Sequence, residues 1–152
     1  MRKEMLIALK TAIETELKDS WFTATKKVIT ASPRETEDVL YEFPVIFLAP
    51  AATQYQQALG TQRKKYRFVA TLWSRGGYSD LDDIIAEQLD FVDFMTELFP
   101  RTNIVSFTCT ESGSKVTKRF IANVLAEDFS NPNVYTDQVD MRISVPLELE
   151  LL

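Results

Sequence analysis

The stretch that decides the fold is VDMRISVPLELEL, residues 139–151. An apolar side chain occupies every second position, and the positions between hold charged residues, a serine and a proline. Strict alternation predicts a β-strand that buries one face. Thirteen such residues would span about 43 Å, whereas a typical strand spans roughly 17–20 Å. Because a compact chain of this length has a radius of gyration of about 15 Å, the strand must bend or run past its own domain.

The apolar face of this strand continues to the last residues of the sequence, Leu149, Leu151 and Leu152. An apolar strand end left in water is an aggregation hazard. Two interpretations are open. Either the strand bends and ends in a frayed tail, or its end packs on a neighbouring subunit.

Working back from this strand, the sequence predicts several more. Residues 103–127 predict a hairpin that turns at residues 111–114. Residues 63–74 predict a strand with two different faces, one apolar (Tyr66, Phe68, Ala70, Leu72) and one mixed (Lys65, Arg67, Val69, Thr71, Trp73). Residues 43–48 are an apolar run of strand length with Pro44 at its start, and residues 23–30 fit a short strand. Residues 49–62 link the apolar run to the strand at 63–74. They are a long connection rich in glutamine, typical of a functional or disordered loop.

Two helices complete the pattern. Residues 2–18 predict a helix, because Leu6, Leu9, Ile13 and Leu17 recur every three or four residues. The second helix is predicted to start at an N-cap, Ser79, and to stop at Pro100. Grouped strands with two helices predict an α+β fold: a mainly antiparallel sheet of four to six strands with both helices packed on one face, in a single domain of residues 1–152.

The composition excludes several classes of protein. The chain has 152 residues, 45% hydrophobic and 26% charged, which is typical of a globular protein. It has no histidine and one cysteine, so histidine-based catalysis, histidine metal sites and an intrachain disulfide are excluded. A net charge of −5 disfavours nucleic-acid binding. No apolar run fits a signal peptide or a membrane span, so we expect a soluble protein made in the cytoplasm, with no membrane contact.

Three charged or glycine-containing segments are candidate sites. The second helix is acidic, with no basic residue between Asp80 and Pro100; this predicts a solvated face, or a wall that repels nucleic acid or meets a basic partner. The only dense basic cluster, residues 63–67, fits protection of a strand edge, a salt bridge to that acidic helix in another subunit, or a DNA contact. Gly76 and Gly77 precede a helix, but the segment lacks the Gly-Lys-Ser/Thr sequence that ends a phosphate-binding loop.

The remaining chemistry points away from catalysis. Asp80, Asp82 and Asp83 are explained by the dipole at a helix start rather than by a metal. Cys109 falls on the apolar face of its strand and is expected to be a buried thiol. No nucleophile, base and oxyanion donor occur together, so we expect no enzyme activity, no cofactor and no metal.

The order of elements resembles that of the tail terminator, or tail-completion, proteins of long-tailed bacteriophages and related gene-transfer particles. The similarity covers most of residues 1–152. It is carried by soft motifs: the strand ending at Trp73-Ser74, the helix start YSDLD at residues 78–82, and the closing VDMRISVPLEL at residues 139–149. The resemblance implies a hexameric ring without enzyme activity or cofactor. Such a ring caps the tail tube, stops its polymerisation and joins it to the neck or head connector, in the virion.

Within that resemblance, residues can be assigned to surfaces. We expect the long connection to contact the tail tube or the lumen through Tyr55, Gln56, Gln57 and Gln62. We expect the interfaces between subunits to use Arg63, Lys65, Arg67, Trp73, Leu149 and Leu151. DNA would pass through the lumen without specific binding, because like charges repel.

Two other functions fit the same sequence. The protein could be another component of the neck, such as a stopper or connector between head and tail. It could also be a small α+β enzyme or ligand-binding domain, which would require a deep pocket lined by convergent polar groups.

Overall fold

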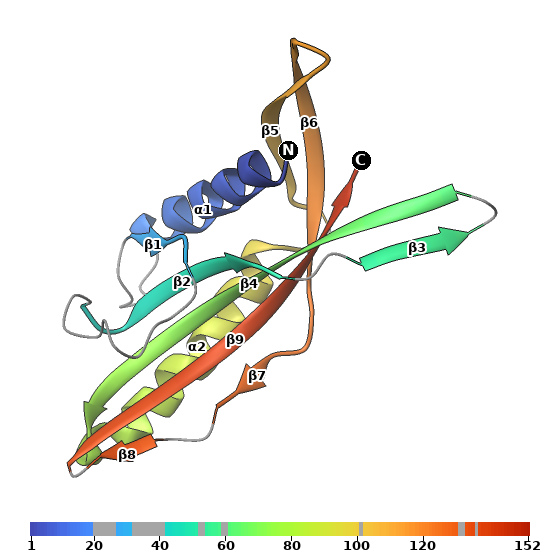
Figure 1. Cartoon of the computed structure of the whole chain (residues 1–152). Helices are drawn as coiled ribbons and strands as arrows, with labels where there is room; N and C mark the ends of the chain where they lie inside the picture. The colour runs from blue at the N-terminus through green and yellow to red at the C-terminus, as the bar shows by residue number, and fades with distance from the viewer. Residues whose placement is uncertain are drawn as a thin grey trace.

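The structure is a computed structural model that describes residues 1–19, 27–31, 42–51, 54–58, 61–100, 102–130, 133–135 and 137–152. At residues 19, 54–58, 61–64 and 133–135 it describes the backbone alone. The described elements, shown in Figure 1, are α1 (Arg2–Asp19), β1 (Val28–Ile29), β2 (Val45–Pro50), β3 (Gln54–Ala58), β4 (Thr61–Gly77), a 3-10 turn (Tyr78–Asp80), α2 (Leu81–Leu98), β5 (Ile104–Glu111), β6 (Ser114–Val124), β7 (Asp128–Phe129), β8 (Asn133–Tyr135) and β9 (Gln138–Leu151).

These strands form one sheet in the order β1-β2-β4-β9-β6-β5. The short strand β3 pairs with β4, and β7 and β8 pair with β9. Only β1 and β2 run parallel; the other pairs are antiparallel. The predicted α+β class, with a mainly antiparallel sheet, is therefore confirmed.

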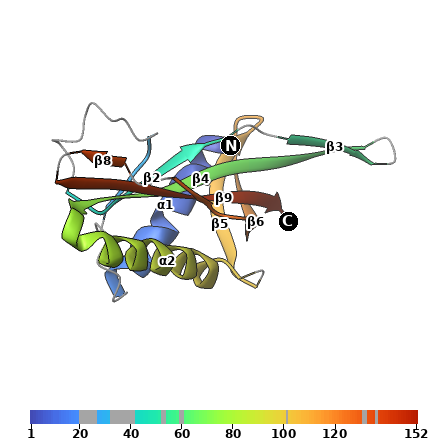
Figure 2. The ribbon, with the colours of Figure 1, turned by 90° about the horizontal axis from the view of Figure 1, so that it is seen from below.

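Both helices cover the same face of the sheet, as predicted. Four side chains of α1 (Met5, Leu9, Ile13, Leu17) and three at α2 (Phe91, Met95, Phe99) join one hydrophobic cluster with the inner faces of β2, β4 and β9. Figure 2, which views the sheet nearly edge-on, shows α2 running beneath β4 and β9. The stripe of α1 includes the buried Met5, whereas Leu6 is only partly buried, so the predicted stripe was wrong by one position at its start.

The body of the molecule is built on the long ladder between β4 and β9. Their register runs from Tyr66↔Leu149 to Gly77↔Gln138. The two strands have 17 and 14 residues, and the ladder pairs residues 66–77 of β4 with residues 138–149 of β9. Figure 1 shows that this ladder makes the body elongated. The length of β9 is thus accommodated inside the chain, and the alternative in which the strand runs past its own domain is corrected.

The end of the chain is packed against its own body. Leu149 is fully buried in the main core, and Leu151 pairs with Phe120 and packs partly against that core. The amide of Leu152 donates a hydrogen bond to the carbonyl of Arg119, 3.0 Å away. Leu152 alone among these leucines is exposed. Both earlier interpretations of the strand end, a frayed tail and an apolar face that needs a neighbour, are therefore corrected.

Three predicted boundaries also change. The segment 49–62, predicted as a loop, contains β3 and the beginning of β4. The second helix begins at Leu81 with Asp80 as its N-cap, one residue beyond the predicted N-cap, Ser79. Residues 23–30 contain, in their described part, only the two-residue strand β1. The predicted hairpin at 103–127 is confirmed, with a turn in which Ser112 and Gly113 both have positive φ, as the tightest hairpin connections require.

Gly76 lets α2 approach the sheet closely. A β-carbon added there would lie 3.1 Å from the Cδ1 atom of Ile84. Ile84 packs with Val139 and Met141 of β9 in a small cluster of its own. Gly76 thus sets the distance between β4 and the helix that follows it.

Candidate assembly surfaces

A two-stranded ribbon projects from the body, and we call it the arm: β3 together with residues 61–65 of β4. Its register runs from Gln54↔Lys65 to Ala58↔Thr61. The ladder of β9 on β4 starts only at Tyr66, and that of β2 starts at Phe68. Within the described residues, the two strands of the arm therefore pair only with each other, and Figures 1 and 2 both show them extending away from the helices. An isolated two-stranded ribbon is marginally stable in water.

The arm brings together five of the predicted site residues. Tyr55 pairs with Lys64, Gln56 with Arg63, and Gln57 with Gln62. The structure thus places Tyr55, Gln56, Gln57, Gln62 and Arg63 on one ribbon, although their side chains lie outside what it describes. Sequence reasoning grouped the first four as a loop and assigned Arg63 to a different surface.

Lys65 and Arg67 share a carboxylate on the face of the sheet opposite the helices. The Nζ atom of Lys65 lies 3.0 Å from Glu148 Oε1, and Arg67 Nη2 lies 3.0 Å from Glu148 Oε2. Arg67 Nε donates a further hydrogen bond to Oε2 at 3.2 Å. Arg67 pairs directly with Glu148 across the ladder, and Lys65 is two residues away on the same strand. The proposed interface cations are therefore half-exposed side chains that already have a partner in their own chain.

The electrostatics of this cluster favour an ionised Glu148. Burial of the carboxyl group alone would raise its pKa, but the hydrogen bonds from Lys65 and Arg67 outweigh burial, and the pKa of Glu148 lies below its ordinary value. Two cations around one anion leave this site with a net positive charge at the base of the arm.

Trp73 anchors a second cluster on the same face. Its indole Nε1 donates a hydrogen bond to Asp140, and Arg75 Nη2 lies 2.9 Å from the other oxygen of that carboxylate. The Cζ atom of Arg142 lies 4.2 Å from the centre of the Trp73 ring, and the ring of Phe43 meets Trp73 edge-on at 5.2 Å. Trp73 is fully buried.

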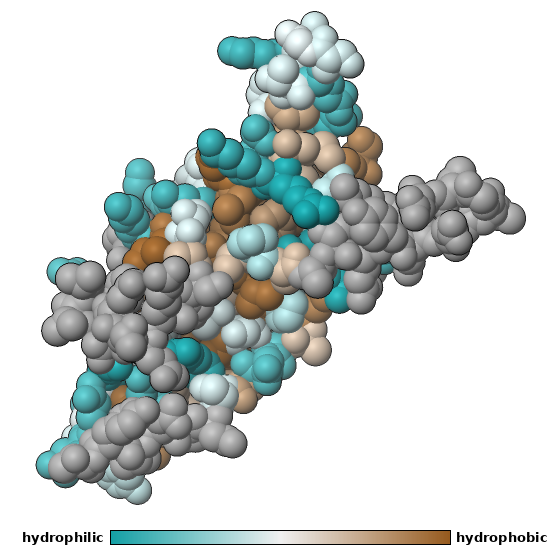
Figure 3. All heavy atoms as spheres, viewed as in Figure 1, coloured by the Kyte–Doolittle hydropathy of each residue, from teal (hydrophilic) through white to brown (hydrophobic). Residues whose placement is uncertain are grey.

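These positions correct two of the predicted interface residues. Trp73 and Leu149 are each 0% exposed because they fill the interior of their own chain, so their side chains offer no surface to a neighbour. Leu151 is partly buried and packs on the core. Figure 3 shows this face of the molecule, where hydrophobic and hydrophilic residues are mixed.

The outer face of α2 is different in character. Along it runs a row of exposed residues spaced three or four apart: Asp82, Ile85, Leu89, Asp93 and Glu97. Ile85 and Leu89 are 39% and 50% exposed, which is high for large apolar side chains. Within the described part of the chain, none of the three carboxylates in this row has an ion-pair partner. The row is an apolar strip between unneutralised negative charges.

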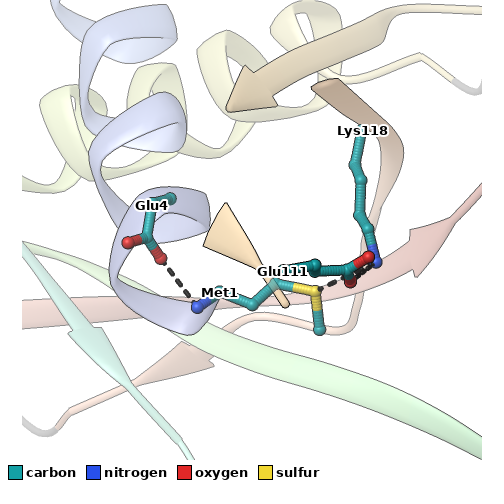
Figure 4. Close-up of polar contacts among 4 residues, drawn as sticks. All are labelled: Met1, Glu4, Glu111 and Lys118. Atoms are coloured by element: carbon teal, nitrogen blue, oxygen red, sulfur yellow. Dashed lines mark hydrogen bonds and ion pairs between the residues drawn. The ribbon is translucent and has the colours of Figure 1, made fainter. Parts of the chain in front are cut away.

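The start of α1 is held beside the β5–β6 hairpin (Figure 4). The amino group of Met1 lies 2.7 Å from Glu4 Oε2, and this hydrogen bond lowers the pKa of Glu4. Lys118 forms an ion pair with Glu111 across the hairpin, which raises the pKa of Lys118, and its Nζ lies 4.0 Å from the sulfur of Met1. These exposed contacts position the start of α1 beside the hairpin. Figure 3 shows that the tip of the hairpin is hydrophilic to neutral.

Two buried polar groups were missed by the sequence reasoning. Gln88 of α2 is fully buried and Ser74 of β4 nearly so. Neither side-chain amide atom of Gln88, nor the hydroxyl of Ser74, has a hydrogen-bond partner among the described residues. Each sits within an otherwise apolar pattern, and no sequence signal distinguishes it. Cys109 is buried, as predicted.

The described residues contain neither a metal-binding cluster nor a membrane-spanning helix. No group of three or more His, Cys, Asp or Glu residues there is arranged to hold a metal ion. No helix in this part of the chain is long and apolar enough to cross a membrane.

Comparisons with known proteins identify the fold alone. No family model matches this sequence, and no curated protein matches it. A solved structure whose name states no function aligns with 100% of this chain and 97% of its own length, with a TM-score of 0.53 and 14% sequence identity. At that identity, the likeness establishes that this architecture exists in another protein and says nothing of what either does.

Proposed function

We propose that this protein is a tail terminator: a structural protein without enzyme activity that forms a ring on the last ring of a phage tail tube. The resemblance implies six copies in this ring. The ring stops polymerisation of the tube and presents its other rim to the neck. DNA passes through its lumen without specific binding. The protein works in the virion after synthesis in the host cytoplasm.

The observation that carries this proposal is the arm. Its two strands have no other strand of the described chain beside them, and a second copy would supply what is missing. When a projecting element of one subunit packs on a different surface of the next, the contact is heterologous, and repeated rotation closes it into a ring. We therefore assign the contact between subunits to the arm rather than to the buried end of β9.

The motifs behind the resemblance also fall in one place. Trp73 and Ser74 pair with Arg142 and Met141 in the β4–β9 ladder. The helix start at residues 78–82 leads into α2, which packs on that ladder through Ile84. The three motifs therefore form a common structural unit, and the arm extends from one of its strands.

The test compares the protein with an armless variant. Asn-Gly replaces residues 53–65, which leaves a four-residue connection between Ala51 and Arg67. The Ala51 amide already donates to the Arg67 carbonyl at 2.9 Å, so this short turn fits the existing geometry. Lys65→Ala is the matched control, because the armless variant also loses the ion pair of Lys65.

We expect rings with a central hole from the unaltered protein and from Lys65→Ala, in negative-stain images taken alone or with tail-tube protein. We expect folded monomers from the armless variant. Unaltered protein that stays monomeric even on tube ends contradicts the proposal. Capture by a portal or adaptor protein, with no binding to tail tubes, would reassign the protein to another part of the neck.

A further inference from the structure

The charges of this chain are separated along the sequence in a way that the fold preserves. From Phe43 to Ser79 there are five basic residues and no acidic one, whereas from Asp80 to Pro100 there are seven acidic residues and no basic one. The first segment supplies the arm and β4; the second supplies α2. The two segments thus carry opposite charge on different surfaces.

The arm cannot use the α2 of its own chain. Figures 1 and 2 show the arm pointing away from the body on the side remote from most of α2. The cations at its base are partly neutralised by Glu148, but two cations share that single carboxylate. The acidic row on α2 has no cation opposite it among the described residues. Among the described residues, neither surface meets its complement in its own chain, and a second copy carries both complements.

We propose that the arm of one copy lies along the exposed row of α2 in the next copy. This inference rests on the proposed ring and names the two surfaces that meet in it. Ile85 and Leu89 would pack under the ribbon, and Asp82, Asp93 and Glu97 would face the basic segment that contains Arg63 and Lys64.

The two surfaces are similar in length. Five residues of extended strand span about 17 Å. The row from Asp82 to Glu97 spans about 22 Å along a helix that rises about 1.5 Å per residue, so the arm would cover most of it. The contact would cover both an isolated ribbon and an exposed apolar strip, and the surrounding charges would fix which way the ribbon lies.

Cysteine cross-linking tests which surfaces touch. In a Cys109→Ala background, one protein carries Gln57→Cys on the arm and another carries Leu89→Cys on α2. We expect a disulfide-linked dimer on mild oxidation of the mixture, and little from either protein alone. A chain that carries both cysteines should give a ladder of covalent oligomers. Glu16→Cys, at an exposed position of α1, replaces Leu89→Cys in the control mixture and should give no dimer.

Charge reversal tests why they touch. The pair Arg63→Glu and Lys64→Glu, or the pair Asp93→Lys and Glu97→Lys, should each weaken association about tenfold or more, and mixing the two variants should restore it. Glu127→Lys, a reversal at an exposed residue outside α2, should change nothing.

The outcomes separate this inference from the proposed function. Rings that form without the arm-to-α2 cross-link, and without rescue by the mixed reversals, overturn the inference and leave the tail-terminator proposal standing. Arm-to-arm or α2-to-α2 cross-links from single-cysteine proteins overturn it too, because they show a two-fold contact. Protein that never associates, alone or on tail tubes, overturns both.

Discussion

The two halves of β4 differ more than their common strand would lead one to expect. From Tyr66 onward the strand is paired with β9, and over residues 68–73 it is flanked on both edges, with a face packed under helices. From Thr61 to Lys65 it is paired only with β3 among the described residues. Strand pairing and helix packing within one chain hold the body together. The arm has no comparable contacts among the described residues. We infer that folding depends on the first half and assembly on the second.

The largest effect should come from Trp73→Ala in the body. The change removes a fully buried ring and leaves Asp140 without its indole donor. We expect a loss of about 3–5 kcal/mol in the free energy of unfolding, measured by urea denaturation of dilute protein. Tyr55→Ala on the arm is the comparison, with an expected change below about 0.5 kcal/mol. Equal losses from the two variants would abolish the distinction between body and arm.

Glu148→Gln should have the next largest effect, because the site lies where the body meets the arm. The variant leaves Lys65 and Arg67 without their shared carboxylate. We expect a loss of about 2 kcal/mol, since both cations are partly solvated. Lys65→Ala should cost less, because Arg67 keeps its hydrogen bonds to Glu148.

The same carboxyl group predicts a dependence on pH. The pKa of Glu148 is lower in the folded chain than its ordinary value of 4.5. Its ionised form is therefore favoured by folding, so the stabilisation is complete above that ordinary value and is lost as the pH falls through the lower, folded pKa. Urea midpoints between pH 7 and about pH 3 should fall more steeply for the unaltered protein than for Glu148→Gln. Parallel curves would show that the ion pairs add nothing.

The smallest effect, with the opposite sign, is expected from Gln88→Met. Gln88 is buried with no hydrogen-bond partner among the described residues, and methionine has a similar shape without the amide. Removing an unpaired buried amide should stabilise the body by about 1–2 kcal/mol. Ring formation should not change, because this side chain lies beneath α2 and not on its outer row. A destabilised variant would mean that the amide has a partner after all.

Alternation along the strands predicted more of this fold than any other signal. It assigned the faces of β4 and β9 correctly. Alternate side chains of a strand point to opposite faces, so the face that carries the apolar residues is the buried one. It missed the arm, because the sequence QYQQA of β3 has no apolar face and that ribbon is defined by backbone pairing. The error on Leu149 came from treating the domain as a sphere, when two long strands pair along its length.

The clusters on the sheet surface were beyond sequence reasoning for a different reason. Trp73 and Asp140 are 67 residues apart, and only the register that pairs Arg75 with Asp140 brings them together. The same holds for Lys65, Arg67 and Glu148. Lys65, Arg67 and Trp73 stand out in the sequence by residue type, but the strand order that brings Asp140 and Glu148 to them cannot be predicted from a local pattern.

Hydrogen exchange tests the contrast between the two halves of β4 most directly. In dilute protein, we expect the amides of residues 61–65 to exchange much faster than those of residues 68–73, and in assembled protein we expect both segments to be protected. Protection of residues 61–65 that is already complete in the monomer, or that does not change when rings form on tail tubes, would contradict the claim that the arm is completed by a second copy.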